Sequence, residues 1–232
     1  HHHIWVSEQR AEGNMAALQQ EPLPQGILLD DAFQHRYVHA HFQILLTTAQ
    51  EPFFEDYPLP AGNLRESRHG ARRASAVIVT KWDPHTPEHR QAYFRERIGR
   101  YTSAPVFFSQ LRYGILRNNQ QQSPQSSQAV VLTGIARPQP FIQEMASRFS
   151  IAEHLNYPDH HHFSDREITR IEQRCQDSIP LITTQKDYIR LQQRLRPELL
   201  PQLYYIPVEP TLAPEDTRQL LQLIRDSYPS QE

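Results

Sequence analysis

Short apolar runs alternate with amphipathic stretches along most of the chain. Strands are predicted where apolar residues are continuous, at 4–6, 27–29, 42–46, 76–80, 106–108, 129–132, 181–183 and 204–208. Continuous runs of Val, Ile and Leu are typical of strands covered on both faces, as in parallel sheets. Helical stretches fill the intervals, so the pattern predicts an α/β layered architecture with largely parallel sheets.

Local signals mark the starts of several helices. Residues 86–88, Thr-Pro-Glu, combine an N-cap hydroxyl with proline at the first helical position. Ser164 and Glu167 have the spacing of a capping box, and Pro214 begins a final helix near 214–228. Another helix is predicted from a stripe at helical spacing that contains Phe141, Ile142, Met145 and Phe149.

Two segments interrupt this rhythm. Residues 51–73 are rich in Pro, Gly, Arg and Glu and show neither a helical nor a strand period. Residues 118–128 are polar and of low complexity, which favours a mobile surface loop. The first segment is predicted to be a domain boundary, an active-site loop, or both.

Composition restricts the class of protein. Hydrophobic residues make up 38% and aromatic residues 9%, which is typical of a globular chain. The net charge of −2 argues against a broad nucleic-acid-binding face. No apolar run approaches the roughly 18 residues of a membrane span, and the single cysteine, Cys175, excludes a disulfide framework. We expect a soluble chain in which His1–His3 are the remnant of a purification tag.

Adjacent acids follow the predicted strand at 27–29. Asp30 and Asp31 come directly after it, and Gln34 and His35 follow. Ligands of open parallel sheets bind beyond the carboxyl ends of the strands, where acids commonly hold Mg²⁺. An N-cap pair that begins the next helix is the alternative interpretation.

Arginine and glutamate occur together in the segment 59–66, Leu-Pro-Ala-Gly-Asn-Leu-Arg-Glu. Arg65, Glu66 and a nearby glycine suit a loop that binds an anion or a metal. An exposed loop carrying a surface ion pair is the alternative interpretation.

Three consecutive histidines, His160, His161 and His162, follow Pro158 and Asp159. Neither a cysteine nor an HxxxH spacing supports a zinc site. A single histidine acting as acid or base is the functional interpretation, because its free pKa is near neutrality. The alternative is an exposed histidine-rich turn before a capped helix.

Two more strands end in polar residues. Thr133, Gly134 and Arg137 follow the predicted strand at 129–132, where a tight turn leads into a helix whose first N–H groups could bind an anion. Lys186 and Asp187 follow the strand at 181–183, and helix capping by Thr184 is the alternative there.

Five of these motifs occur in the order and spacing of a known family. They are DDAFQHR at 30–36, LPAGNLRE at 59–66, TGIARPQPF at 133–141, PDHHHFS at 158–164 and TTQKDYIRL at 183–191. From about residue 4 to 210 the chain resembles the tetraacyldisaccharide 4'-kinases, which phosphorylate a lipid disaccharide with ATP in lipid A biosynthesis. The resemblance implies a P-loop-kinase-like layered α/β sandwich in two domains. Residues 4–50 would end the nucleotide-binding domain, and 51–232 would form a second α/β domain with a linker loop at 51–73.

The resemblance also assigns roles to residues. Asp30, Asp31 and Glu66 match acids around Mg²⁺ and the ATP phosphates, and His160 matches a histidine that activates the sugar hydroxyl. The acidic partner of that histidine is expected outside this chain. We therefore expect Asp30, Asp31, Glu66 and His160 to converge in space.

Binding roles are expected for a further set of residues. The substrate, a lipid disaccharide 1-phosphate, would contact Gln34, His35 and Arg65. The turn after residue 132, with Thr133, Gly134 and Arg137, would contact the nucleotide.

The chain departs from the family pattern at three places. Ala32 stands where the family has glycine, and Asn63 stands where it has proline. None of the seven glycines belongs to a G-x-x-x-x-G-K-[ST] phosphate loop. The family has that loop, with a membrane-associating segment, before the position of Ile4. The resemblance therefore implies a truncated kinase with little activity, from an enzyme peripheral to the cytoplasmic face of the bacterial inner membrane.

Two other functional classes stay open. One is a non-catalytic module that binds lipid or a partner, and the other is a metal-dependent phosphohydrolase built from the acids and the three histidines. A tightly bound transition metal would favour the phosphohydrolase.

Overall fold

The computed structural model describes residues 4–7, 10–35, 38–176 and 179–228. The chain folds into two compact units, His1–Gln110 with Pro210–Glu232 (unit 1) and Leu111–Glu209 (unit 2). The domain boundary predicted near residue 50 differs from this division, because it falls inside unit 1 between two strands that pair with each other. The predicted tag, 1–3, lies outside the described residues.

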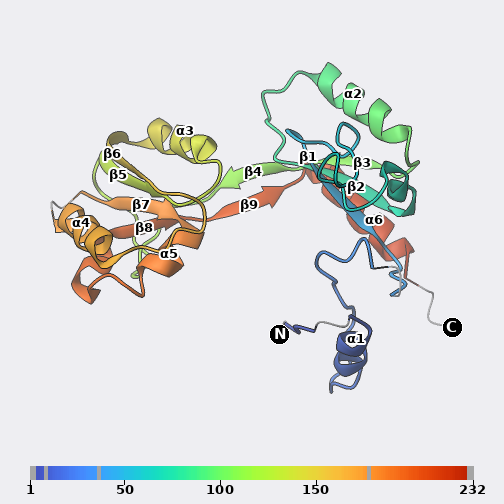
Figure 1. Ribbon diagram of the computed structural model, residues 1–232, viewed down its shortest axis with the longest axis horizontal. Helices are drawn as coiled ribbons and strands as arrows, with labels where there is room; N and C mark the ends of the chain where they lie inside the picture. The colour runs from blue at the N-terminus through green and yellow to red at the C-terminus, as the bar shows by residue number, and fades with distance from the viewer. Residues whose placement is uncertain (1–3, 8–9, 36–37, 177–178, 229–232) are drawn as a thin grey trace. The chain divides into compact units, whose positions relative to one another are not determined.

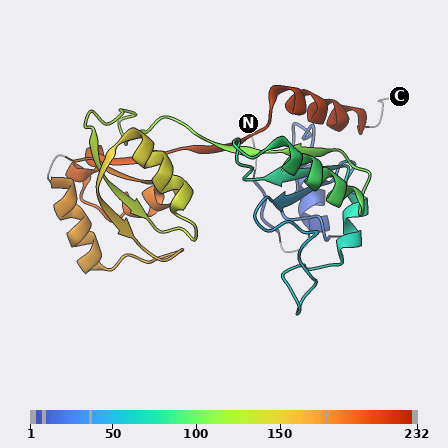
Figure 2. The same cartoon turned by 90° about the horizontal axis from the view of Figure 1, so that it is seen from above.

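Unit 1 is built on a parallel sheet of three strands in the order β1-β2-β3 (Figure 1). These strands are β1 (Ile44–Thr48), β2 (Ala76–Thr80) and β3 (Val106–Phe108). Alternate side chains of β2 point to opposite faces of the sheet. Val77 and Val79 pack in one cluster with Phe94 of α2 (Glu88–Gly99), whereas Ala76 packs in another with Leu220 of α6 (Pro214–Asp226). The sheet is therefore covered by one helix on each face, as Figure 2 shows for α6 in red.

The remainder of unit 1 is less regular. It contains α1 (Arg10–Leu18) and a 3₁₀ helix, η1 (Arg68–Arg73). The strands predicted at 4–6 and 27–29 are wrong: Val6 and Leu28 are 97% and 95% exposed, and neither segment pairs with a strand in the described part of the chain. The segment 51–73 buries Phe53 and Phe54 in the core of this unit, so it is part of the fold rather than only a linker.

Unit 2 contains a parallel sheet of four strands in the order β6-β5-β7-β8. The strands are β5 (Gln128–Thr133), β6 (Ser150–Asn156), β7 (Leu181–Thr184) and β8 (Leu203–Ile206). Helix α3 (Gln139–Arg148) packs with Val131 and Ile182 on one face. Helices α4 (Asp165–Gln176) and α5 (Gln185–Leu191) pack with Leu132 and Leu181 on the other, and η2 (Pro197–Gln202) precedes β8. The prediction of an α/β fold with parallel sheets is confirmed.

The strand order of unit 2 indicates where a ligand would bind. β5 lies between β6 and β7; the chain leaves β5 through α3 on one face and leaves β7 through α5 on the other. In open α/β sheets ligands bind outside the carboxyl ends of the strands at such a switch point. The polar residues after β5, β6 and β7 lie at this edge.

The strands β4 (Gln110–Tyr113) and β9 (Val208–Thr211) pair as a two-stranded sheet. Both boundaries between the units fall inside these two strands. Unit 2 is thus an insertion into unit 1, which the chain enters through β4 and leaves through β9.

Candidate active site

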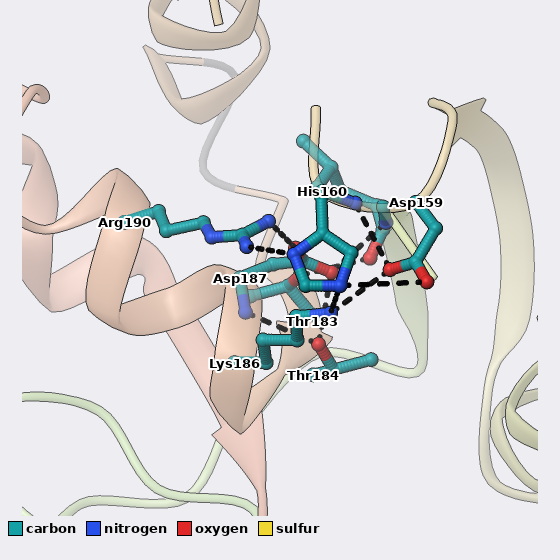
Figure 3. Close-up of polar contacts among 9 residues, drawn as sticks. Asp159, His160, Thr183, Thr184, Lys186, Asp187 and Arg190 are labelled. Carbon is teal, nitrogen blue, oxygen red and sulfur yellow. Dashed lines mark hydrogen bonds and ion pairs between the residues drawn. The ribbon is translucent and has the colours of Figure 1, made fainter. Parts of the chain in front are cut away.

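His160 lies in the loop from β6 to α4 and projects from the edge of the sheet of unit 2 (Figure 3). Its backbone has a φ of 59°, and its side chain is 72% exposed. The ring lies between two cations of α5: Nδ1 is 3.3 Å from Nη2 of Arg190, and Nε2 is 3.3 Å from Nζ of Lys186. A ring held this way keeps a defined orientation while it stays accessible to a substrate.

Asp159, the residue before His160, ties the loop to α5. Its Oδ1 accepts a hydrogen bond of 2.9 Å from Lys186 Nζ and another of 2.9 Å from the backbone N–H of His160. The hydrogen bond from Lys186 is the main reason that the pKa of Asp159 is below its ordinary value. Its Oδ2 lies 3.8 Å from Nε2 of His160.

Asp187 is buried at the same edge of the sheet. Its side chain is 0% exposed, and its Oδ2 accepts hydrogen bonds of 2.9 Å from the Gly134 N–H and of 2.9 Å from the Thr184 hydroxyl. Arg190 Nη1 lies 3.6 Å from its Oδ1, which is an ion-pair distance rather than a hydrogen bond. Thr184 accepts from the Asp187 N–H and caps α5, so the capping interpretation of this segment is confirmed.

The turn after β5 has partners within the chain. Thr133 is buried, with its Oγ1 2.9 Å from His154 Nε2, and it donates to Asn156 at 3.2 Å. Burial lowers the pKa of His154. The Gly134 N–H, which we predicted to face a nucleotide, already donates to Asp187, and Arg137 is exposed. The nucleotide-binding role of this turn stays a prediction.

The turn nevertheless borders an open pocket of about 490 Å³. The pocket is lined by residues of the segment after β5 and of the segment at the end of β6: Ile135, Ala136, Pro138, Gln139, Asn156, Tyr157, Pro158 and Asp159. It lies at the carboxyl ends of β5 and β6, close to the base of the His160 loop.

The other two histidines have different surroundings. His161 Nε2 lies 3.0 Å from Glu167 Oε1, and its ring stacks on Tyr157 with centroids 4.9 Å apart. The Ser164 N–H and hydroxyl both donate to Glu167, which confirms the capping box; with His161 they lower the pKa of Glu167 to about 2. The side chain of His162 is exposed. His161 therefore stabilises the loop that carries His160.

In unit 1 the structure brings together Asp31, Gln34 and Arg65. Arg65 Nη1 donates to Asp31 Oδ2 at 3.0 Å and to Gln34 Oε1 at 3.4 Å. The side chains of Arg65 and Asp31 are 63% and 69% exposed, and the Asp31 backbone has a φ of 47°. Ala32 follows in place of the family glycine. Asp30 and His35 have exposed side chains nearby in the sequence.

Glu66 is half-buried against η1. Its Oε1 accepts a 2.6 Å hydrogen bond from Arg73, which also donates to the backbone oxygen of Phe33 at 3.1 Å. Glu66, Arg65 and Gln34 all line a small pocket of about 70 Å³. Of the residues predicted in unit 1 to contact the substrate or a metal, these three line the pocket, whereas Asp30, Asp31 and His35 do not. Convergence of these residues with His160 stays a prediction.

The acids of unit 1 suit a magnesium ion in part. Within the described ranges no group of three or more His, Cys, Asp or Glu side chains lies close enough to hold a metal ion. Mg²⁺ is commonly held by one or two carboxylates, with water and substrate phosphates as the other ligands. Asp31 and Glu66 offer the right donor atoms, each now paired with an arginine.

A family model for tetraacyldisaccharide-1-P 4'-kinase (LpxK) matches residues 1–226. The chain belongs to this family. The tetraacyldisaccharide 4'-kinase of Flavobacterium johnsoniae is 39% identical over 213 residues, which cover 90% of this chain and 61% of that protein. The kinase of Cytophaga hutchinsonii is 37% identical over 230 residues, covering 95% of this chain and 64% of that protein.

Among solved structures, LpxK from Aquifex aeolicus, crystallised in complex with ATP, is similar with a TM-score of 0.68 and 26% identity. The alignment covers 97% of this chain and 64% of that one. This similarity confirms the predicted P-loop-kinase-like fold. The chain spans about six tenths of the length of these LpxK relatives.

Helices long and apolar enough to cross a bilayer are absent from the part of the chain that the structure describes.

Proposed function

We propose that the chain takes part in the ATP-dependent phosphorylation of the 4'-hydroxyl of a tetraacyldisaccharide 1-phosphate. Membership of the LpxK family supports this proposal, as does the ATP bound to the Aquifex aeolicus relative. The observation in this chain that carries it is the exposed ring of His160, held at the ligand-binding edge of a parallel sheet by Lys186 and Arg190. Such a ring can accept a proton from an alcohol that enters from solvent.

Each predicted site residue has a role in this reaction. His160 takes the proton of the 4'-hydroxyl as that oxygen attacks the γ-phosphorus of ATP. Asp30, Asp31 and Glu66 would hold Mg²⁺, which would neutralise the charge of the ATP phosphates. Arg65, Gln34 and His35 would contact the sugar or the 1-phosphate, and a guanidinium suits a phosphate through paired N–H groups.

We further propose that these 232 residues alone have little kinase activity and bind Mg-ATP weakly. No G-x-x-x-x-G-K-[ST] sequence occurs among them. The amides and lysine of such a loop normally supply much of the phosphate binding and of the stabilisation of the transition state. The residues Thr133, Gly134 and Arg137 would be a secondary contact for the nucleotide. By family resemblance, a region before Ile4 would contact the cytoplasmic face of the inner membrane.

A chimera tests the function directly. The part of the Flavobacterium johnsoniae kinase that lies before its match to this chain is fused ahead of Ile4, and transfer of labelled phosphate from ATP to the disaccharide 1-phosphate is measured. We expect the chimera to form the 4'-phosphate and the 232-residue chain to form little or none. Turnover by the chain alone would refute the proposed inactivity but support the function.

The opposite results are equally informative. A folded chimera that binds both ATP and the disaccharide 1-phosphate without transferring phosphate would refute the kinase proposal in favour of a binding module. Micromolar Mg-ATP binding to the chain alone, measured by calorimetry, would refute the proposed weak affinity.

A further inference from the structure

Both ring nitrogens of His160 face groups that can only donate hydrogen bonds. Nε2 lies 3.3 Å from the ammonium of Lys186, and Nδ1 lies 3.3 Å from the guanidinium of Arg190. Neither side chain has an acceptor atom, whereas a neutral imidazole has one acceptor nitrogen and one N–H. The ring can therefore accept from only one of the two cations at a time.

The local fold places both donors beside the ring of His160. Lys186 and Arg190 are four residues apart on α5, so they lie one turn apart on the same face of the helix. The start of α5 is fixed by the buried Asp187, which accepts from Gly134 of the turn after β5. Figure 3 shows the ring of His160 lying between Arg190 and the pair formed by Lys186 and Asp159.

We propose that Lys186 and Arg190 are positioning residues that compete to set the tautomer of His160. When Lys186 donates to Nε2, the ring hydrogen is on Nδ1; when Arg190 donates to Nδ1, the ring hydrogen is on Nε2. Asp159 belongs to the same balance, because its Oδ2 lies 3.8 Å from Nε2 and its Oδ1 is bonded to Lys186. The tautomer proposal depends on the proposed function in one respect: the tautomer decides which nitrogen can take the proton of the substrate hydroxyl.

The proposal gives the two cations opposite effects, which a role in folding alone would not give. In Lys186→Met the donor to Nε2 is lost and Asp159 loses its partner, so the ring hydrogen moves to Nε2. In Arg190→Met the donor to Nδ1 is lost, so the ring hydrogen moves to Nδ1. Hydrogen bonds to charged groups are strong enough to change each tautomer ratio by about tenfold.

Long-range ¹H–¹⁵N correlation spectra of the imidazole rings measure the ratio in the 232-residue protein without ATP or lipid. The His160 signals are assigned by their loss in His160→Gln, and spectra are taken with the ring neutral. His161 is the internal reference, because its Nε2 faces the acceptor Glu167, which none of these substitutions changes. Arg170→Met is the matched control, since Arg170 pairs with Glu153, which keeps Arg174 as a second partner.

We expect opposite shifts for Lys186→Met and Arg190→Met, and none for Arg170→Met. Lys186→Arg and Arg190→Lys keep a donor and should return the ratio to within about twofold of the wild type. Unchanged ratios in both Met variants, or shifts in the same direction, would overturn the proposal. The result does not depend on phosphoryl transfer, so a failed kinase assay and a failed tautomer test are separate outcomes.

Discussion

The two groups of candidate residues differ in how their charges are held. In unit 1 the carboxylate of Asp31 pairs with Arg65 at 3.0 Å, and both side chains are more than 60% exposed. In unit 2 the carboxylate of Asp187 is fully buried and bonded to Gly134 and Thr184. Exposed ion pairs contribute about 0–1 kcal/mol to stability. The ion pair between Arg65 and Asp31 can therefore break, and either side chain can bind a ligand instead, with little loss of stability. The loop of His160, in contrast, is positioned before any ligand arrives.

The largest effect is expected at the exposed ring that unit 2 presents. His160→Ala in the chimera should lower turnover by about 10²–10⁴-fold, the usual contribution of a general base. The Michaelis constant for ATP should change little, because the phosphate loop and the metal hold the nucleotide. Steady-state kinetics with His162→Ala as the exposed control tests this, and equal losses in both variants would instead favour a metal cluster.

The largest effect on stability is expected at the buried Asp187. Asp187→Ala leaves the Gly134 N–H without its acceptor and the Arg190 guanidinium without its ion-pair partner, and it should lower the free energy of unfolding by about 3 kcal/mol. Urea denaturation measures this change. Asp187→Asn keeps an acceptor oxygen and should lose less. If Asp187→Ala lowers the free energy of unfolding by less than a substitution of an exposed residue does, the burial of Asp187 has no energetic role.

An intermediate effect is expected at His161. The ring of His161 packs on Tyr157 and contacts Glu167. We therefore expect His161→Ala to lower the free energy of unfolding of unit 2 by about 1–2 kcal/mol. His162→Ala is the matched control, because His162 is exposed. Equal stability of the two variants would contradict this.

The same loop should respond to acid. The pKa of Glu167 is lowered from 4.5 to about 2, so the unfolded chain binds more protons than the folded one between these values. Glu167 therefore adds stability that is fully present above pH 4.5 and is lost as the pH falls towards 2. Thermal unfolding of Glu167→Gln across this window should show a shallower dependence on pH than the wild type, and parallel curves would contradict the assignment.

The smallest change should be at the exposed pair. Asp31→Ala should alter the free energy of unfolding by less than about 0.5 kcal/mol, because the pair is open to solvent. In the chimera the same substitution should raise the Mg²⁺ concentration needed for half-maximal turnover. A large loss of stability with an unchanged magnesium requirement would reverse the contrast between the two regions.

Much of the fold could be predicted from the sequence because its central strands are continuously apolar. Strands β2, β3, β5 and β7 were predicted within a residue or two, and so were the starts of α2, α4 and α6. β6 was missed because its burial alternates: Glu153 and His154 interrupt its apolar residues on an edge strand that is covered on one side only. Strands were wrongly predicted at 4–6 and 27–29, because these runs are apolar although their side chains are exposed.

The motifs of the candidate site were visible in the sequence, but the contacts among their residues were not. The motif containing His160 and the strand end containing Lys186 were both visible in the sequence. Arg190 was missed, although its spacing of four residues from Lys186 on a predicted helix was a usable signal. No local pattern could show that Asp187 accepts from Gly134, because the two residues are 53 positions apart in the sequence. The polar segment at 118–128 was predicted as mobile, yet Asn118 is buried and bonded to Pro201.

The insertion of unit 2 between β4 and β9 also sets an order of events on the ribosome. Strands β1, β2 and β3 are all synthesised before unit 2, but α6, which covers Ala76 and Phe107, follows residue 209. At 5–20 residues per second, the roughly 100 residues of unit 2 take about 5–20 s to synthesise. During that interval α6 cannot cover its face of these strands, so we expect the packing of unit 1 to finish only after unit 2 has been synthesised.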